Sequence, residues 1–331
     1  MRIFPKTDSP QVRVARLSFV VAMVLLVVKM GAWLLTGSAA ILSDALESII
    51  NVVAAAFAVL SVTVAETPPD DRHPYGHGKI EFYAAWFEGM LILFASVLIF
   101  WESWDKIFHP EPLPNLGGGI ALLVAAGLVN LWLGVLLTSR GKRSGSLTLI
   151  ADGKHVLTDV YTSGGVLIGL GLVAVTGWLW LDGLIACLVG LNIAWTGLDL
   201  VRRSVAGFMN ESDPALLDNI CTLLRDNRHP SWIDIHRLRA FKSGREIHVD
   251  LHLILPRDLR LAEAHEQVVA MEDLLRKGIG PEADIMIHAD PCTDGRCPVC
   301  DVASCDMRVA PSVATPLWSR SSTGVPAGKQ S

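Results

Sequence analysis

Six long apolar stretches dominate the first part of the chain, at about residues 14–35, 39–64, 82–104, 117–138, 147–176 and 178–202. A helix needs about 20 apolar residues to cross the roughly 30 Å hydrocarbon core of a bilayer, and each stretch reaches that length. The first stretch follows Arg13 and Arg16 and is not followed by a small-residue cleavage site, so it is predicted to be a retained helix and not a signal peptide. We therefore predict an α-helical membrane protein with a six-transmembrane-helix bundle over residues 1–209.

Lysine and arginine are distributed unevenly between the segments that connect these stretches. If the N-terminus is cytosolic, the cytosolic segments hold Arg2, Lys6, Arg13, Arg16, Arg72, Lys79, Arg140, Lys142, Arg143, Arg202 and Arg203. The opposite segments hold only Lys106. Because cytosolic loops carry the excess of positive residues, both termini are predicted to face the cytosol. No organelle-targeting segment is visible, so the bacterial inner membrane is the expected location.

After Arg203 the long apolar stretches end and polar residues become frequent. Asp213-Pro214 is a typical helix start and predicts a helix to about Asn227, and residues 259–277 predict a second helix. Residues 232–241 and 245–255 alternate with period two and predict two strands, and residues 284–288 predict a third. This α-β-β-α-β order predicts a small cytosolic α/β domain over residues 210–291. A Cys-containing, largely disordered tail is expected over residues 292–331.

Composition narrows the class of protein further. Apolar residues make up 51% of the chain, charged residues 18%, and the mean hydropathy is +0.42, which favours a bilayer environment. The net charge of −5 argues against a nucleic-acid partner, which would require a basic surface. Six cysteines in 331 residues are too few for a disulfide-stapled secreted scaffold.

Ionisable residues inside the apolar stretches point to a metal site. Asp44, Glu47 and Asn51 are spaced by three and four residues in the second stretch, and His155 and Asp159 are spaced by four in the fifth. These spacings place each set on one helical face. Carboxylates, an amide oxygen and an imidazole suit a divalent transition metal. The alternative is a hydrogen-bonded polar cluster that only holds the helices together.

A second group of possible ligands lies in the connection between the second and third stretches. Asp70, His73 and His77 supply a carboxylate and two imidazoles within eight residues, in the sequence Asp-Asp-Arg-His-Pro-Tyr-Gly-His. These residue types suit a metal ion. A solvated loop with incidental histidines would have the same sequence.

Four motifs together resemble the cation diffusion facilitator family over about residues 12–291. They are the Thr36-Gly37-Ser38 turn, the His-Pro-Tyr-Gly-His-Gly-Lys loop ending at Lys79, the His155-x-x-x-Asp159 pair, and the final Ile287-His288-Ala-Asp290-Pro segment. The resemblance implies a homodimeric exporter that exchanges divalent metal cations for protons by alternating access. It also implies a metallochaperone-like fold for the cytosolic domain. It implies no prosthetic group, and the metal ions would be substrates and regulatory ligands.

The resemblance also implies which residues bind metal. The transport site would be Glu47, Asn51, His155 and Asp159, with Asp44 as a further candidate, and the loop site would be Asp70, His73 and His77. A cytosolic-domain site would contain His236, His252, His265, His288 and Asp290, with His248 as a further candidate. Strand alternation independently places His248 and His252 on one face, and His288 and Asp290 on one face. Ordinary surface histidines of the strands are the alternative.

The second-stretch ligands depart from the family's usual pattern, which is Asp or His followed by Asp. Glu47 lengthens one ligand and Asn51 removes a charge. We favour Zn²⁺ or Fe²⁺ as substrate, and Mn²⁺, Co²⁺, Ni²⁺ and Cd²⁺ are also compatible with these donors. Asn51 keeps a second function open, which is a non-transporting metal sensor or partner subunit with the same fold. No nucleophile–base pair or phosphate loop is visible in the membrane domain, so an enzyme is not expected.

Four cysteines follow the last predicted strand with the spacing C-x4-C-x2-C-x4-C, namely Cys292, Cys297, Cys300 and Cys305. Cytosolic thiols stay reduced, so metal coordination is more natural here than disulfide formation. The alternative is a flexible, partly occupied metal trap.

Overall fold

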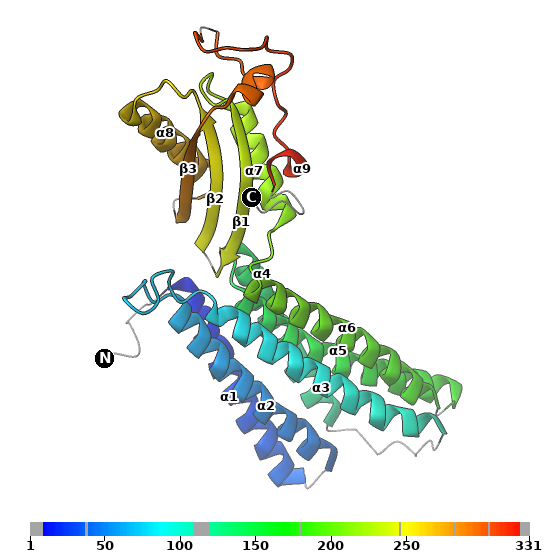
Figure 1. Cartoon of the computed structure of the whole chain (residues 1–331). Helices are drawn as coiled ribbons and strands as arrows, with labels where there is room; N and C mark the ends of the chain where they lie inside the picture. Colours follow the sequence, from blue (N-terminus) through cyan, green and yellow to red (C-terminus); the bar gives the residue numbers. More distant parts are fainter. Residues whose placement is uncertain are drawn as a thin grey trace. The chain divides into compact units, whose positions relative to one another are not determined.

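The computed structural model describes residues 9–36, 39–108, 119–178, 180–244, 246–280, 282–303 and 305–324 (Figure 1). The chain divides into two compact units, Met1–Met209 and Asn210–Ser331.

Long helices build the described part of the first unit. They are α1 (Pro10–Thr36), α2 (Ala39–Ala65), α3 (Ile80–Phe108), α4 (Gly119–Ser144), α5 (Leu147–Thr176) and α6 (Trp180–Phe208). Each contains 26 to 30 residues. At about 1.5 Å of rise per residue, such helices are long enough to cross a bilayer.

All six helices are apolar along most of their length. Within the described residues, three stretches are long and apolar enough to span a membrane, namely Pro10–Gly31, Ile80–Trp101 and Val124–Ser144. Large apolar side chains such as Phe94 (58% exposed) and Trp195 (74% exposed) lie on the outside of the unit, as a lipid environment requires.

Small residues bring α3 and α6 close together, and the two helices lie side by side in Figure 1. A Cβ atom added at Gly89 would lie 3.2 Å from the carbonyl oxygen of Gly197, and one added at Gly197 would lie 3.1 Å from that of Gly89. The two backbones therefore approach as closely as small-residue interfaces in membranes allow. An ion pair between Lys154 Nζ and Asp199 Oδ2 (2.9 Å) joins α5 to α6.

The second unit has the predicted order of elements. They are α7 (Pro214–Asp226), β1 (Asp234–Ser243), β2 (Glu246–Leu255), α8 (Leu261–Ile279), β3 (Ala283–Pro291), the short 3-10 helix η1 (Asp294–Val299) and α9 (Arg320–Thr323). The side chain of Asp213 caps α7 by accepting a hydrogen bond from the backbone N–H of Ala215 (3.0 Å), as the Asp-Pro sequence predicts. The sheet order is β1-β2-β3, with β1 and β2 antiparallel and β2 and β3 parallel.

One face of this sheet forms the core and the other carries polar residues. Val249, Leu251 and Ile285 pack in one cluster with residues of α7 and α8. In β1 the alternation is interrupted by a bulge between His236 and Arg239, where Arg237 has a positive φ of 53°. The extra residue leaves both Ile235 and Leu238 in the core, and it leaves His236 on the opposite, open face.

The structure differs from the expectation of a largely disordered tail over residues 292–331. Trp318 is only 2% exposed and belongs to the core cluster of the second unit. Its indole N–H donates to Asp234 (3.2 Å), and the guanidinium of Arg228 lies 4.4 Å from the centre of its ring. The Ser- and Pro-rich composition indicated disorder, but one large aromatic side chain buries enough apolar surface to hold residues 305–324 on the domain.

Candidate metal centres

In the first unit, Asn51 of α2 contacts two side chains of α5. Its amide Nδ2 donates to Asp159 Oδ2 (2.5 Å), and its Oδ1 lies 3.0 Å from His155 Nε2. His155 and Asp159 are one turn apart on α5, so both face the same point on α2. The predicted group of Asn51, His155 and Asp159 is therefore brought together.

The second ring nitrogen of His155 is an unusual feature of this group. Nδ1 is buried and has no hydrogen-bond partner within the described part of the chain, and His155 as a whole is only 5% exposed. Buried polar atoms are normally paired, so Nδ1 is an exception, whereas Nε2 is the ring nitrogen that faces Asn51. An imidazole nitrogen, a carboxylate and an amide oxygen match the donors that bind divalent transition metals. Asp44 and Glu47 belong to α2, but their side chains lie outside the described residues.

A cavity of about 20 Å³ adjoins Asn51. Its lining includes Lys29 of α1, Asn130 of α4 and Asp152 of α5, none of which the sequence assigned to a site. Lys29 is 6% exposed and Asp152 is 1% exposed. The volume is sufficient for about one water molecule. The signal in the sequence was the presence of charged residues inside apolar stretches, because such residues are rare in membranes.

The loop between α2 and α3 brings its three predicted residues together. His73 Nδ1 lies 3.1 Å from Asp70 Oδ1, and His77 Nε2 lies 3.1 Å from His73 Nδ1. The ligand atoms of all three residues lie within 4.8 Å of one another. The backbone N–H of His73 donates to Asp70 (2.7 Å) and is the main reason why the pKa of this carboxyl is lowered from 3.8. The carboxyl of Asp70 is therefore anionic at neutral pH.

In the second unit, three histidines form a row across the open face of the sheet. His236 is the register partner of His252, and His252 is the partner of His288. Asp290 accepts contacts from all three, at 2.8 Å from His252 Nδ1, 3.5 Å from His236 Nε2 and 3.1 Å from His288 Nε2. We call these four residues the histidine row. Ligand atoms of His236, His252 and Asp290 lie within 4.8 Å of one another, as a metal ion would require.

Burial changes the pKa of His236 in the histidine row. It lowers the pKa of His236 below 6.5, and the neighbouring His252 lowers it further, against the opposite effect of Asp290. His236 is therefore neutral at pH 7, which is the form that binds metal.

Two of the six predicted cytosolic residues lie outside the histidine row. His265 is exposed on α8, which packs against the core face of the sheet, so it is on the side opposite the row. His248 lies on the open face, four residues before His252 in β2. Its Nδ1 contacts Asp284 (3.1 Å) and not Asp290. Strand alternation alone could not separate His248 from His252, because both satisfy the same period of two.

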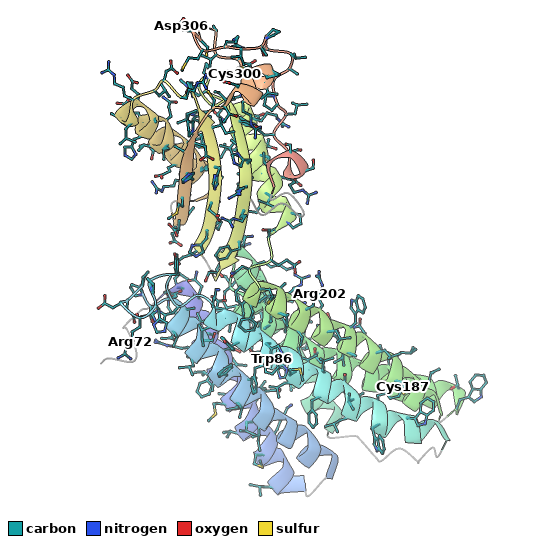
Figure 2. All side chains as sticks on the ribbon, in the orientation of Figure 1. Arg72, Trp86, Cys187, Arg202, Cys300 and Asp306 are labelled. Carbon is teal, nitrogen blue, oxygen red and sulfur yellow. The ribbon has the colours of Figure 1, made fainter. Side chains whose placement is uncertain are left out.

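The four cysteines after β3 lie around one pocket at the end of the sheet, where η1 begins; Cys300 is labelled there in Figure 2. All four are free thiols.

Membrane-length helices with buried metal-type ligands, together with a separate α/β domain that carries a histidine row, define a membrane protein that handles metal cations. The comparisons with known proteins agree. Residues 15–209 match the model of the cation efflux transmembrane domain, and residues 213–292 match that of the cytoplasmic domain of cation efflux proteins.

Relatives of the chain are a transporter and cation-efflux pumps. An uncharacterized transporter of Synechocystis sp. is 35% identical over 283 residues, which is 85% of this chain and 90% of the relative. The cation-efflux pump FieF of Shewanella oneidensis is 30% identical over 279 residues, covering 84% of this chain and 93% of the pump. The FieF pump of Salmonella arizonae is 30% identical over 282 residues, covering 85% and 93%.

The chain belongs to the cation diffusion facilitator family, and it is a membrane transporter for divalent cation efflux, not an enzyme. The predicted fold class, a helical membrane domain followed by a cytosolic α/β domain, is confirmed.

Proposed function

We propose that this protein exports Zn²⁺ or Fe²⁺ from the cytosol in exchange for protons, as a homodimer in a bacterial inner membrane with both termini in the cytosol. Mn²⁺, Co²⁺, Ni²⁺ and Cd²⁺ are further candidate substrates. The observation that carries the proposal is the contact of Asn51 with both His155 and Asp159 between α2 and α5. The match of 195 residues to a cation efflux transmembrane domain (15–209) supports it.

The transport site in this proposal consists of Glu47, Asn51, His155 and Asp159, with Asp44 as a further candidate ligand. A cation that enters replaces the hydrogen bonds that Asn51 makes with its two partners. The carboxylates of Glu47 and Asp159 would neutralise the charge of a divalent ion, which reduces the cost of placing that ion within the membrane.

Proton exchange follows from the chemistry of the same ligands. Metal binding requires deprotonated ligands, so loading releases protons, and protons that enter from the other side favour release of the cation. His155 and Asp159 are the proposed proton exchangers, because an imidazole titrates near neutral pH. A rocking motion of the helices would expose the site first to one side and then to the other.

The two other groups of ligands have supporting roles in the proposal. Asp70, His73 and His77 would capture metal at the loop between α2 and α3. The histidine row would bind regulatory metal in the cytosolic domain and favour a tighter dimer. These roles are supported by the ligand atoms of the three loop residues, and by those of His236, His252 and Asp290, which lie within 4.8 Å of one another in each group.

Reconstitution in liposomes with an imposed pH gradient tests the proposal. Uptake of each candidate metal would be followed for the wild type, for Asp159→Asn and for the control Asp273→Asn, which removes an exposed carboxylate of α8. We expect flux of one or two metals that is reduced on the order of 100-fold in Asp159→Asn and is unchanged in the control, since one loses a proposed ligand and the other does not. Size-exclusion chromatography would verify that both variants remain folded dimers.

The second candidate function, a non-transporting sensor or partner subunit, has one observation in its favour. Asn51 ties His155 and Asp159 together through hydrogen bonds, where the usual family residue would contribute a charge. Bound metal and an intact dimer without flux of any metal would replace the exporter proposal by this second function.

A further inference from the structure

The four cysteines of the C-terminal segment surround a single pocket. Cys292 follows β3, Cys297 lies in η1, Cys300 follows η1, and Cys305 lies in the next turn. All four line a pocket of about 300 Å³. Apart from Cys292, they lie beyond residues 213–292, which match the cytoplasmic domain of cation efflux proteins. Three of the four thiols therefore come from a segment beyond the matched domain, and they line the pocket together with residues of that domain.

The pocket has a defined shape because its walls are bonded to one another. The backbone N–H of Cys292 donates to the carbonyl of Leu255 (2.8 Å), at the end of β2. The chain then returns over the cysteines: Val313 donates from its backbone to Pro298 (2.7 Å), and the hydroxyl of Thr315 donates to Asp301 (2.6 Å). Cys300 is 6% exposed and clusters with apolar residues of the sheet end.

Charged groups of both signs lie around the thiols. Arg257, Arg296 and Arg308 line the pocket together with Asp258 and Asp294. Arg257 pairs with Asp294 (3.0 Å), and Arg296 pairs with Asp234. Arg308 donates to the carbonyl oxygens of Cys300 (3.3 Å) and Val302 (2.6 Å), and its Nη2 lies 4.0 Å from Cys300 Sγ. A divalent cation with four thiolates has a net charge of −2, because four negative charges oppose two positive ones. The guanidinium of Arg308 beside Cys300 offsets part of such a charge and favours the thiolate.

The spacing of the cysteines fits one type of ion. A pair separated by two residues, such as Cys297 and Cys300, is a common chelating unit of structural zinc sites, and a further cysteine on each side completes a tetrahedral set. Among the described residues, the groups whose ligand atoms already lie within 4.8 Å of one another are Asp70, His73 and His77 of the loop, and His236, His252 and Asp290 of the histidine row. The cysteines thus line the pocket without converging, and a cation would draw them inward.

We propose that Cys292, Cys297, Cys300 and Cys305 bind one thiophilic divalent cation of the Zn²⁺ type per protomer, and that this ion fastens residues 292–324 to the cytosolic domain. Binding converts four thiols to four thiolates and releases four protons, with no change of oxidation state. The site is structural and does not depend on the transport function proposed above.

Titration of the full-length, fully reduced protein in detergent with Co²⁺ tests the site. Thiolate ligands give Co²⁺ an intense sulfur-to-metal charge-transfer absorption, which nitrogen and oxygen ligands of the other proposed sites do not give. We expect the intensity of this band at saturation to correspond to one thiolate-bound Co²⁺ per protomer, and we expect Zn²⁺ to displace the band. The band should be lost in the double variant Cys297→Ser, Cys300→Ser and retained in Cys187→Ala, which removes a buried thiol of α6.

Limited proteolysis tests the fastening of the tail. Zn²⁺ should slow cleavage after Arg308 at least fivefold in the wild type and leave the rate in the double variant unchanged. Absence of the charge-transfer band in the wild type, or its persistence in the double variant, would overturn the site. A band without protection of the tail would overturn the fastening role.

Discussion

The two buried or half-buried sets of metal-type ligands in this transporter are built in different ways. In the membrane unit, the side-chain amide of Asn51 lies between two partners. It donates to a carboxylate oxygen of Asp159, and its own oxygen contacts Nε2 of His155. In the cytosolic unit, one carboxylate gathers three imidazoles, and Asp290 is the shared partner. A metal ion must replace the two hydrogen bonds of Asn51 in the first set, whereas in the second set it replaces contacts between the imidazoles and a carboxylate that is itself a candidate ligand.

The exposed fractions of the histidine side chains also differ between the two sets. His155 is 5% exposed. In the histidine row, the side chains range from 22% exposed at His252 to 65% at His288. Electrostatic interactions are stronger where water is excluded. We infer that the membrane set is suited to selectivity and coupling, and the histidine row to rapid exchange with the cytosolic pool of metal.

Replacing the shared partner of the histidine row has the largest expected effect. Asp290→Ala leaves the three imidazoles without their carboxylate, and we expect metal affinity of the cytosolic unit to fall on the order of 100-fold. Isothermal titration with Zn²⁺ would measure it in a background that carries Asp159→Asn, Cys297→Ser and Cys300→Ser, because the proposed thiolate site also binds Zn²⁺. Asp284→Ala is the matched control, because Asp284 lies on the same strand and contacts His248 (3.1 Å). Equal losses in the two variants would contradict the assignment.

Adding a negative charge to the membrane set should raise its metal affinity, in contrast to the loss expected in the histidine row. Asn51→Asp places a carboxylate beside His155 and Asp159, and we expect metal affinity of this set to rise about tenfold, or about 1.4 kcal/mol. Flux should also become more dependent on pH, because one more ligand must lose its proton. Metal binding and flux between pH 6 and pH 8 would measure both effects.

Asn130→Asp provides the control for this prediction. Asn130 lines the same small cavity as Asn51 but belongs to α4 and is not a proposed ligand. An equal rise in affinity from Asn130→Asp would show that charge near the cavity is sufficient, and that direct contact with His155 is not required.

Local patterns predicted most of the fold. Apolar length predicted the helices, the Asp213-Pro214 pair predicted the start of α7, and period-two alternation predicted the strands. The tail was predicted less well, because the burial of Trp318 depends on a site formed by distant parts of the domain. The contacts of this indole with Arg228 and Asp234 cannot be predicted from the periodicity of the sequence.

The same distinction applies to the metal-type ligands. The four-residue spacing of His155 and Asp159 was enough to place them on one face. Their bonds with Asn51 depend on how α2 packs on α5, which the sequence does not specify. Likewise, the row of His236, His252 and His288 depends on the strand register and on the bulge after His236.

The loop between α2 and α3 should respond less strongly to substitution than either set. Asp70→Asn removes the anionic member of the loop group, and we expect the metal concentration for half-maximal uptake to rise about threefold with the maximal rate retained. The effect is small because the loop is exposed and screened by solvent. Proteoliposome uptake at graded metal concentrations would measure it, with Asp71→Asn as the neighbouring control.

The smallest expected effect concerns protonation of His236. Burial is the main cause of its lowered pKa, and His252 adds to it, so the folded protein takes up this proton at lower pH than the unfolded chain does. Between pH 6.5 and the lowered pKa, the unfolded state therefore binds more protons, and acidification destabilises the cytosolic unit. The contribution is below about 1 kcal/mol, because His236 is partly exposed.

Measurement of histidine hydrogen–deuterium exchange at C2 against pH would give the pKa of His236 in the full-length protein. Asp290 favours the protonated ring and Arg296 disfavours it. We therefore expect Asp290→Asn to lower the pKa of His236 further and Arg296→Gln to raise it. Shifts of the same sign in both variants would show that the charges at this end of the sheet do not control His236. Opposite shifts would explain why the histidine row keeps a neutral, metal-binding imidazole under mildly acidic conditions, where an exposed histidine is already protonated.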